Sequence, residues 1–281
     1  MAHKTIINGT SYDVKGGKCL VNGTSYDIKK GRTLIGGTGY DITFGPPLPM
    51  PVKGDLITMN LDGTERQYRV LSVNGNVCKV LGMWDNLHSA WRKDYNTTTT
   101  MGTLTVAKYE GSTLDTYLNT TWYNTLTSAT KAAIVPENVV CDAWSWDDAG
   151  DPDYTGTYGT SVPGTENYTI SKYAGGTLNI GNRNVFALGV QDVIDYLNDS
   201  SVQVDTSAIL RNVNIWKMFW NDEVSHSGKS PLLRSSYAGY SSTAWGVSGF
   251  DGSLTSSSVK YSDIVRPALN LDMSKIQYTL V

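Results

Sequence analysis

The sequence has little cysteine, little histidine and little charge. Its 281 residues include 3 cysteines and 3 histidines, and 17% of the residues are charged. Cys19, Cys78 and Cys141 stand far apart, with no CxxC pair and no His/Cys cluster. Neither a zinc site nor a disulfide framework is therefore predicted, and we expect no metal and no cofactor.

The chain also lacks a basic patch and a long apolar run. The formal net charge is -3 and the pI is about 5.6, and no run of Lys or Arg is long enough to capture nucleic acid. No apolar segment approaches the roughly 20 residues that span a membrane. The start, Met1 to Thr5, lacks the apolar stretch of a signal peptide. We expect synthesis in the cytosol, no membrane insertion and no nucleic-acid partner.

No segment carries a catalytic signature. His3, His88 and His226 have no neighbouring motif of the G-x-S-x-G kind, and the Gly-rich runs lack the Lys-Ser/Thr of a phosphate loop. Glycoside hydrolysis needs two carboxylates facing one cleft. The 26 acidic residues leave this activity possible, but no local sequence pattern favours it. No catalytic residue is predicted.

The sequence is rich in glycine, tyrosine and tryptophan. It contains 28 Gly, 17 Tyr and 8 Trp against 4 Phe, with many Thr, Ser and Asn. Short strands joined by many turns use this mixture. Adaptable binding surfaces use it too, because Tyr and Trp supply rigid contact area and Ser and Asn supply hydrogen bonds. An ordinary β-rich protein also accounts for most of it.

A repeat occupies the first part of the chain. Its three copies are INGTSYDV at 7–14, VNGTSYDI at 21–28 and IGGTGYDI at 35–42. Each copy places Asn-Gly or Gly-Gly between two short apolar segments, which is a strong signal for a type I′ turn, since both central residues take positive φ. Residues 1–45 are thus predicted to be a small all-β module, a meander of hairpins.

Each copy has one apolar face after its turn. Side chains alternate along a strand, so the shared face consists of Tyr12, Val14, Tyr26, Ile28, Tyr40 and Ile42. Hairpins of this size bury little alone, so this face is expected to need a partner. We interpret it as an anchor to other proteins; the alternative is an extra sheet packed on the rest of this chain.

A proline-rich segment, PPLPMP at 46–51, follows the repeat. Prolines cannot extend a sheet and favour a stiff spacer. We therefore predict a linker at 46–51 and a second domain at 52–281.

The second domain combines strand and helix patterns. Turn signals at Asp62-Gly63 and Asn74-Gly75 predict strands at 56–59, 66–73 and 76–81. Helical spacing then predicts three helices, whose markers are the cap Ser112, the cap Thr127 with the stop Pro136, and the apolar set Val190, Val193, Ile194 and Leu197. Residues 142–167 and the last 70 residues are expected to form loops and short strands. The fold class is α+β.

The C-terminal segment carries the most specific pattern. PLLRS at 231–235 precedes a Ser/Tyr/Gly-rich stretch, VSGFDGSL at 247–254 and IVRPALNL at 264–271. In this order the blocks resemble a bacterial and phage domain family of unassigned function, distantly similar to C-type-lectin and formylglycine-generating-enzyme folds. The resemblance covers most of residues 52–275. The hairpin repeat resembles modules at the start of virion proteins of Firmicutes phages.

The resemblance implies a C-type-lectin-like α+β scaffold that displays the residues between the LRS and VRPA blocks. The ligand-binding set would be Tyr237, Tyr240, Ser241, Ser242, Trp245, Ser248 and Phe250. Aromatic side chains spaced by Gly and Ser suit this role, since they bind at low entropic cost. A place in the core is the alternative for Trp245 and Phe250. Arg234 and Arg266 are predicted to bond nearby carboxylates or loop carbonyls.

Two patterns suggest calcium, and neither suffices. Trp220-Asn221-Asp222 matches a calcium-binding triplet of C-type lectins, but the companion Glu-Pro-Asn or Gln-Pro-Asp triplet is missing. The aspartates from Asp142 to Asp153 do not match the EF-hand spacing, so we expect a solvated loop. Formylglycine-generating enzymes use paired C-terminal cysteines, and none lies beyond Cys141.

Together these observations predict a non-enzymatic structural protein of a bacteriophage virion, in the tail, the baseplate or the capsid decoration. Residues 1–45 would bind other virion proteins, and residues 52–281 would bind a host cell-surface receptor or glycan. A homo-oligomer is expected, with a trimer as one form, because avidity strengthens weak binding. Two alternatives stay open: a virion enzyme that degrades cell-wall polysaccharide, and a purely architectural component.

Overall fold

The structure is a computed structural model. It describes residues 3–7, 10–14, 18–21, 24–27, 30–35, 38–43, 49–83, 88–90, 98–147, 169–197, 213–220, 230–249, 252–260 and 262–281, with the backbone alone described before residue 49. The chain divides into two compact units, Met1–Met50 and Pro51–Val281. The division falls inside the proline-rich segment 46–51.

The first unit consists of three antiparallel strand pairs. Its strands are β1 (His3–Ile7), β2 (Thr10–Val14), β3 (Lys18–Val21), β4 (Thr24–Asp27), β5 (Lys30–Ile35) and β6 (Thr38–Thr43). Two residues separate the closing partners of each pair, for example Ile7 and Thr10. Each pair is a separate sheet among the described residues, so the expected continuous meander does not form there.

A six-stranded antiparallel sheet forms one half of the second unit. In spatial order its strands are β13 (Ile134–Val135), β20 (Ala268–Asp272), β9 (Val77–Gly82), β8 (Glu65–Asn74), β7 (Leu56–Asn60) and β21 (Tyr278–Leu280). The three strands predicted between residues 56 and 81 are confirmed. Gly63 and Gly75 take positive φ in the turns that join them, at 93° and 58°. The VRPALNL block supplies β20, next to β9.

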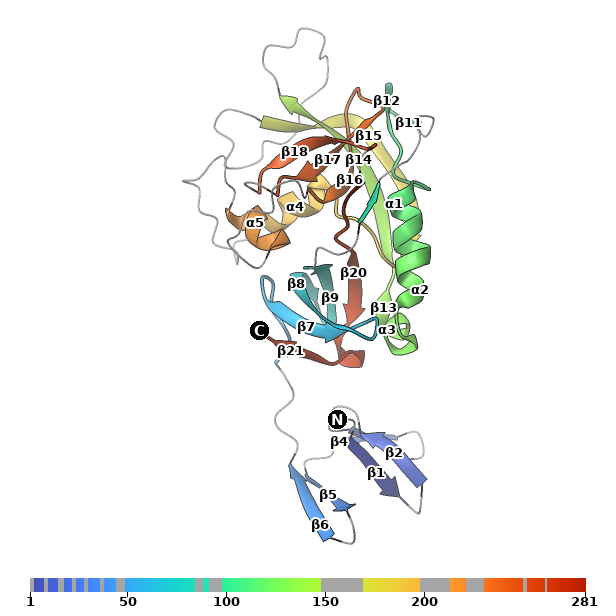
Figure 1. Cartoon of the computed structure of the whole chain (residues 1–281), viewed down its shortest axis with the longest axis vertical. Helices are drawn as coiled ribbons and strands as arrows, with labels where there is room; N and C mark the ends of the chain where they lie inside the picture. Colours follow the sequence, from blue (N-terminus) through green and yellow to red (C-terminus); the bar gives the residue numbers. More distant parts are fainter. Residues whose placement is uncertain are drawn as a thin grey trace. The chain divides into compact units, whose positions relative to one another are not determined.

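A five-stranded sheet forms the other half (Figure 1). Its order is β15 (Thr169–Arg183), β14 (Glu137–Asp147), β16 (Leu232–Tyr237), β17 (Thr243–Val247) and β18 (Leu254–Ser258). β14 and β16 run parallel, and the other neighbours run antiparallel. The expectation of a loop from residue 142 was wrong for residues 142–147, because β14 continues to Asp147. Residues 141–145 are all buried, as in a strand that is covered on both faces.

Two shorter strand pairs complete the described sheets. β10 (His88–Ala90) pairs with β19 (Ser262–Ile264), and β11 (Thr98–Met101) pairs with β12 (Leu104–Ala107). A 3-10 turn, η2 (Met273–Lys275), follows β20.

The first predicted helix is confirmed, with an unpredicted interior. It comprises α1 (Thr113–Thr116), the π-helix η1 (Tyr117–Trp122) and α2 (Tyr123–Thr125) in direct succession, and runs alongside the sheets in Figure 1. The Ser112 hydroxyl caps it by accepting the N–H of Asp115 at 3.1 Å. Leu114, Leu118 and Trp122 are buried.

The other two predicted helices also form. α3 (Ser128–Ala133) is capped by Thr127, and α4 (Val190–Leu197) buries its predicted apolar set. α5 (Val213–Phe219) was not predicted and corrects the expectation that the last 70 residues form only loops and short strands. No helix among the described residues is long and apolar enough to cross a membrane. The fold class is therefore α+β, with one core of buried side chains from Ile57 to Tyr278.

Candidate functional site

The predicted display segment forms β16, β17 and the turn between them. The backbone N–H of Tyr240 donates to the carbonyl of Tyr237 at 3.3 Å, and Gly239 takes a positive φ of 80°. Tyr240 lies in this turn with 60% of its surface exposed. Among the described side chains no other aromatic residue is classed as exposed. The Gly/Ser-rich turn thus carries a single large ring into solvent.

Stacked rings join this exposed position to the core. Tyr240 meets Tyr237 edge-on at 5.2 Å between ring centroids, and Tyr237 stacks on Trp245 at 5.5 Å with an interplanar angle of 23°. The indole N–H of Trp245 donates to the carbonyl of Trp144 at 2.9 Å. Aromatic pairs at such separations gain free energy beyond the area that they bury. We call Tyr240, Tyr237 and Trp245 the aromatic stack.

Trp245 is a core residue, which corrects the prediction that its side chain is displayed. Its exposed fraction is 0%, and Ala244 and Val247 beside it on β17 are equally buried. The indole both covers apolar area and finds its hydrogen-bond acceptor inside the protein, so burial satisfies the whole side chain. Phe250, predicted with it, lies outside the described residues.

The predicted serines lie at the two ends of β17. Ser241 and Ser242 precede the strand, next to Tyr240, and the carbonyl of Ser242 accepts the N–H of Val259 at 3.0 Å. Ser248 follows the strand, where its N–H donates to the carbonyl of Ser253 at 2.8 Å. The structure therefore brings the two tyrosines together with Ser241 and Ser242, and places Ser248 at the far end of the strand.

Further hydroxyl side chains share the sheet face of Trp245. Residues directly opposite in an antiparallel pair project to the same face, and Ser256 lies opposite Trp245 while Ser258 lies opposite Thr243. Ser256 is exposed, and Thr243 and Ser258 are partly exposed. We call Tyr237, Tyr240, Thr243, Ser256 and Ser258 the hydroxyl–aromatic face. The serines of this face were not predicted, although the run of hydroxyl residues from Thr255 to Ser258 could have indicated them.

Arg234 fixes the strand that carries the tyrosines. Its Nε donates to the carbonyl of Val140 on β14 at 2.9 Å, and its Nη1 donates to the carbonyl of Ala187 at 2.8 Å and to Asp192 Oδ2 at 2.5 Å. The prediction that Arg234 bonds nearby carboxylates or loop carbonyls is confirmed by Asp192 and Ala187, and the carbonyl of Val140 on a strand is a third partner. β16 is thereby tied to β14 and to α4 three residues before Tyr237.

The next two side chains fix the same strand. The Ser235 hydroxyl donates to Asp142 and accepts the N–H of Val190 at 2.8 Å. The Ser236 hydroxyl donates to the carbonyl of Ala107 at 2.7 Å. Three consecutive side chains, the last two of the LRS block and the serine after it, therefore fix β16 by hydrogen bonds, a role that the order of residues alone did not indicate.

The ion pair of Arg234 continues into a longer network. Asp192 Oδ1 accepts from Lys79 Nζ at 3.2 Å, and the same Nζ lies 3.3 Å from Glu137 Oε1. Glu137 Oε2 in turn accepts from the side-chain amide of Asn270 at 2.5 Å. The network links the five-stranded sheet to β9 and β20 of the six-stranded sheet.

Asp142 corrects the expectation of a solvated acidic loop. It is 3% exposed, accepts from the Ser235 hydroxyl and lies 3.6 Å from Lys172 Nζ. Asp147 belongs to β14, and Asp148, Asp151 and Asp153 lie outside the described residues. Because Ser235 and Lys172 surround its side chain, the carboxyl group of Asp142 can lie on a buried part of the strand.

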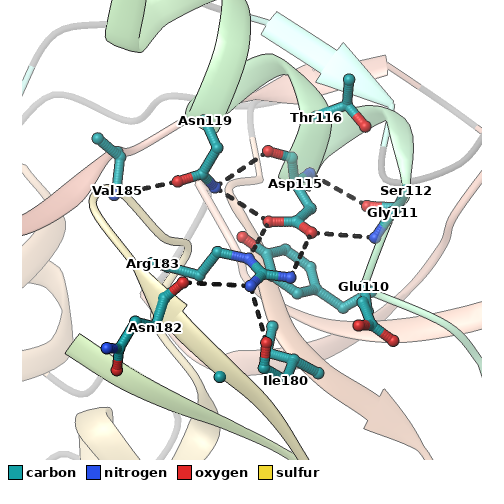
Figure 2. Close-up of polar contacts among 12 residues, drawn as sticks. Glu110, Gly111, Ser112, Asp115, Thr116, Asn119, Ile180, Asn182, Arg183 and Val185 are labelled. Atoms are coloured by element: carbon teal, nitrogen blue, oxygen red, sulfur yellow. Dashed lines mark hydrogen bonds and ion pairs between the residues drawn. The ribbon is translucent and has the colours of Figure 1, made fainter. Parts of the chain in front are cut away.

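A second buried ion pair holds the first helix against β15 (Figure 2). Arg183 Nε and Nη2 donate to the two oxygens of Asp115 at 3.0 and 3.2 Å. The Asn119 amide also donates to Asp115 Oδ1, at 3.0 Å, and the N–H of Gly111 donates to Oδ2, at 3.0 Å. With four donors on one carboxylate, the arrangement stabilises the helix start and leaves little capacity for a ligand.

The remaining candidates for chemistry give no clustered site. Among the described residues no group of three or more His, Cys, Asp or Glu side chains could hold a metal ion. Trp220 of the WND triplet is buried, with the guanidinium of Arg266 5.9 Å from its ring, while Asn221 and Asp222 lie outside the described residues. Cys78 and Cys141 are buried thiols whose pKa burial raises, to about 11 and about 12. Neither is an activated nucleophile.

The charges around Asp192 determine its titration. Burial raises the pKa of the carboxyl, but Arg234, Lys79 and the hydrogen bond from the Gly189 N–H together bring the pKa below its ordinary value of 3.8. Burial lowers the pKa of Arg234, but the nearby Asp192, Asp142 and Cys141 together raise the pKa above its ordinary value of 12.5. Both groups are therefore charged at neutral pH.

The lowered pKa of Asp192 predicts a loss of stability in acid. A carboxyl with a lower pKa in the folded state stabilises the fold above its unfolded pKa, and this contribution disappears as the pH falls through the folded pKa. The stability of Asp192→Asn should therefore be lower at neutral pH and change less than that of the natural chain below about pH 4. Urea unfolding between about pH 7 and about pH 2 measures this, with Glu110→Gln as the control. Equal acid sensitivity of Asp192→Asn and the natural chain would contradict the assignment.

The predicted anchor residues lie on the strands of the first unit. Tyr12 and Val14 belong to β2, Tyr26 to β4, and Tyr40 and Ile42 to β6, while Ile28 lies outside the described residues. Only backbone positions are described there, so their common face stays a prediction.

The fold and these contacts define an α+β domain in which buried ion pairs support an exposed aromatic turn. Residues 91–273 match the family described as "Domain of unknown function (DUF6273)", and because this is more than half of the 281 residues the chain belongs to that family. The matched region contains the aromatic stack, Arg234 and Asp192. No curated protein and no solved structure matches the chain.

Proposed function

We propose that the chain is a non-enzymatic binding protein of a bacteriophage virion. Its second unit is a C-type-lectin-like domain that binds the host cell surface, and its first unit is a hairpin repeat that attaches it to other virion proteins. The aromatic stack carries the proposal. Tyr240 is 60% exposed and rests on Tyr237, which rests on the buried Trp245. A rigid exposed tyrosine supplies contact area at low entropic cost, as binding surfaces require.

The support beneath the stack favours a binding role. A binding residue is effective when the elements that carry it are held by packing and hydrogen bonds. Arg234, Ser235 and Ser236 fix β16 to β14, α4 and β12 immediately before Tyr237. The carboxylates Asp142 and Asp192 take part in this support through basic partners, which favours a structural use of these acids over acid–base chemistry.

The division of the chain favours an anchoring role for the first unit. The second unit has its own core among the described side chains, from Ile57 to Tyr278. The first unit consists of two-stranded pairs, which are marginal in water by themselves. A partner protein on the particle would supply the apolar contact that these pairs need.

Cell binding tests the display half of the proposal. Tyr240→Ala is expected to reduce binding of the full chain to intact Firmicutes host cells about tenfold or more, because it removes the exposed ring. Its thermal unfolding should change little. Tyr123→Ala on α2 is the matched control, since it removes another partly exposed tyrosine, and it should leave cell binding unchanged.

The second arm of the same pull-down uses virions depleted of the protein. The full chain should rebind them, and residues 46–281 should bind cells but not particles. The proposal that the second unit binds host cells is wrong if the folded full chain does not bind the cells. It is also wrong if Tyr240→Ala binds them as well as the natural chain does. Particle binding without cell binding would instead support an architectural component, and breakdown of wall polysaccharide would support an enzyme.

A further inference from the structure

We infer that the hydroxyl–aromatic face binds an uncharged sugar ring, with one face of the sugar on the Tyr240 ring. This inference rests on the proposed function, for which it names the class of ligand. Three observations carry it: the exposed ring, the hydroxyls on the same sheet face, and the lack of charged residues in the two segments that carry them.

The lack of charge is the most selective of these observations. No Asp, Glu, Lys or Arg occurs from Ser235 to Phe250 or from Gly252 to Val259. These two segments cover β17, β18 and the turn that carries Tyr240, and the next charged residue along the chain, Lys260, donates its backbone N–H to Ser258 Oγ at 3.4 Å. Recognition of a phosphate or carboxylate relies on charge-assisted hydrogen bonds, for which Arg and Lys are the usual donors. An electrically neutral ligand matches a surface built without them.

The exposed ring matches the apolar side of a sugar. The C–H groups on one side of a pyranose form a flat apolar patch, and the face of an aromatic ring carries the negative part of its quadrupole. Tyr240 presents such a ring at 60% exposure, and Tyr237 holds it from the side at 5.2 Å. A sugar can therefore cover the ring without disturbing the packing below.

The neighbouring hydroxyls match the polar edge of a sugar. Ser256 and Ser258 lie opposite Trp245 and Thr243, on the face where the aromatic stack lies. Each hydroxyl has one donor and two acceptor positions, so it can pair with a sugar hydroxyl in either direction. A few polar groups beside an apolar contact area are the usual composition of a small-molecule site.

A protein partner is the weaker match for this face. A stable protein interface buries about 800 Å² on each side around an apolar centre. On this face a single exposed aromatic ring stands among small hydroxyl side chains. Such a surface lacks the apolar centre of a stable protein interface.

Direct binding measurements on the full chain test the inference. The probes are immobilised neutral oligosaccharides of glucose, galactose and N-acetylglucosamine, with polygalacturonate and a sialylated oligosaccharide as anionic probes. We expect binding to a neutral probe that is unchanged between about 0.05 M and about 0.5 M NaCl, because no ion pair is screened. Tyr240→Ala should weaken it about tenfold or more, and Tyr240→Phe, which keeps the ring, by less than about threefold.

A pair of charge insertions tests neutrality independently. Ser256→Asp and Ser256→Lys place opposite charges at one exposed position of the face. With a neutral ligand both variants weaken binding to a similar extent. With an anionic ligand Ser256→Lys strengthens binding and Ser256→Asp weakens it, and that opposition overturns the inference.

The remaining outcomes separate this inference from the function on which it rests. Binding only to the anionic probes, binding that falls with salt, or no binding to any neutral probe overturns the sugar assignment. If cell binding that depends on Tyr240 persists in those cases, the binding function stands and its ligand is of another class. If Tyr240→Ala changes neither cell nor probe binding, both proposals fail together.

Discussion

Replacing Arg234 with alanine is expected to lower the free energy of unfolding of the second unit by about 3–5 kcal/mol. The side chain is 9% exposed and makes three hydrogen bonds, two to carbonyls and one to Asp192. The substitution leaves Asp192, itself 13% exposed, without its closest cation, and leaves the carbonyls of Val140 and Ala187 without this donor. Guanidinium unfolding followed by tryptophan fluorescence measures the loss.

An exposed ion pair provides the control for Arg234. Lys108 and Glu110 are 33% and 40% exposed and lie 3.3 Å apart, so Lys108→Ala should cost at most about 1 kcal/mol. Arg234→Lys should remain well below the natural stability, because an ammonium cannot reproduce the planar fork that reaches two carbonyls and a carboxylate. Equal losses for Arg234→Ala and Lys108→Ala would show that the buried pair does not hold β16.

Replacing Trp245 with alanine is expected to cost about 3–5 kcal/mol as well, through a cavity in the core. The indole is fully buried, stacks on Tyr237 and bonds the carbonyl of Trp144. Its loss also removes the base on which the aromatic stack rests, so binding should weaken although Trp245 touches no ligand. Thermal and denaturant unfolding give the first effect, and binding measured well below the melting temperature gives the second.

Tyr240→Ala separates the two roles within the stack. It should change stability by less than about 1 kcal/mol, because the ring is mostly exposed, while it weakens binding directly. Trp245→Phe should lie between the natural chain and Trp245→Ala, since it keeps a ring for Tyr237 and loses the indole N–H. If Trp245→Ala keeps the natural stability but loses binding, then Trp245 contacts the ligand directly, as the sequence analysis predicted.

Local signals in the sequence were sufficient for much of the fold. Ser112 and Thr127 cap the helices that they were predicted to cap, because a hydroxyl before a helical period accepts a free N–H whatever the surroundings. The glycines at 63 and 75 close the predicted turns, because only their φ angles matter there. The carboxylate partner of Arg234 was likewise predicted, while the display role of residues 237–250 stays a prediction.

The elements that the sequence analysis missed depend on partners far along the chain. The aspartates from Asp142 onward suggested a loop, yet Asp142 lies inside a strand. Its carboxyl group has partners there, because the hydroxyl of Ser235, 93 positions away, donates to it and Lys172 lies beside it. Ser112 predicted only the start of a helix, yet Asp115 in the first turn forms an ion pair with Arg183, 68 positions away, which joins α1 to β15. No local pattern marks such pairs, because either residue would be an ordinary surface charge without the other.

The sequence by itself determined the turns at Gly63 and Gly75 and the starts of the helices that Ser112 and Thr127 cap. Only the tertiary structure decided which aromatic ring of the predicted display segment is exposed. Tyr240 and Trp245 both stand among glycine, alanine, serine and threonine, with no charge nearby. The difference arises because β17 pairs on both sides within the sheet, so Trp245 is covered by Tyr237 and bonded to Trp144, while Tyr240 lies in a turn beyond the sheet's end.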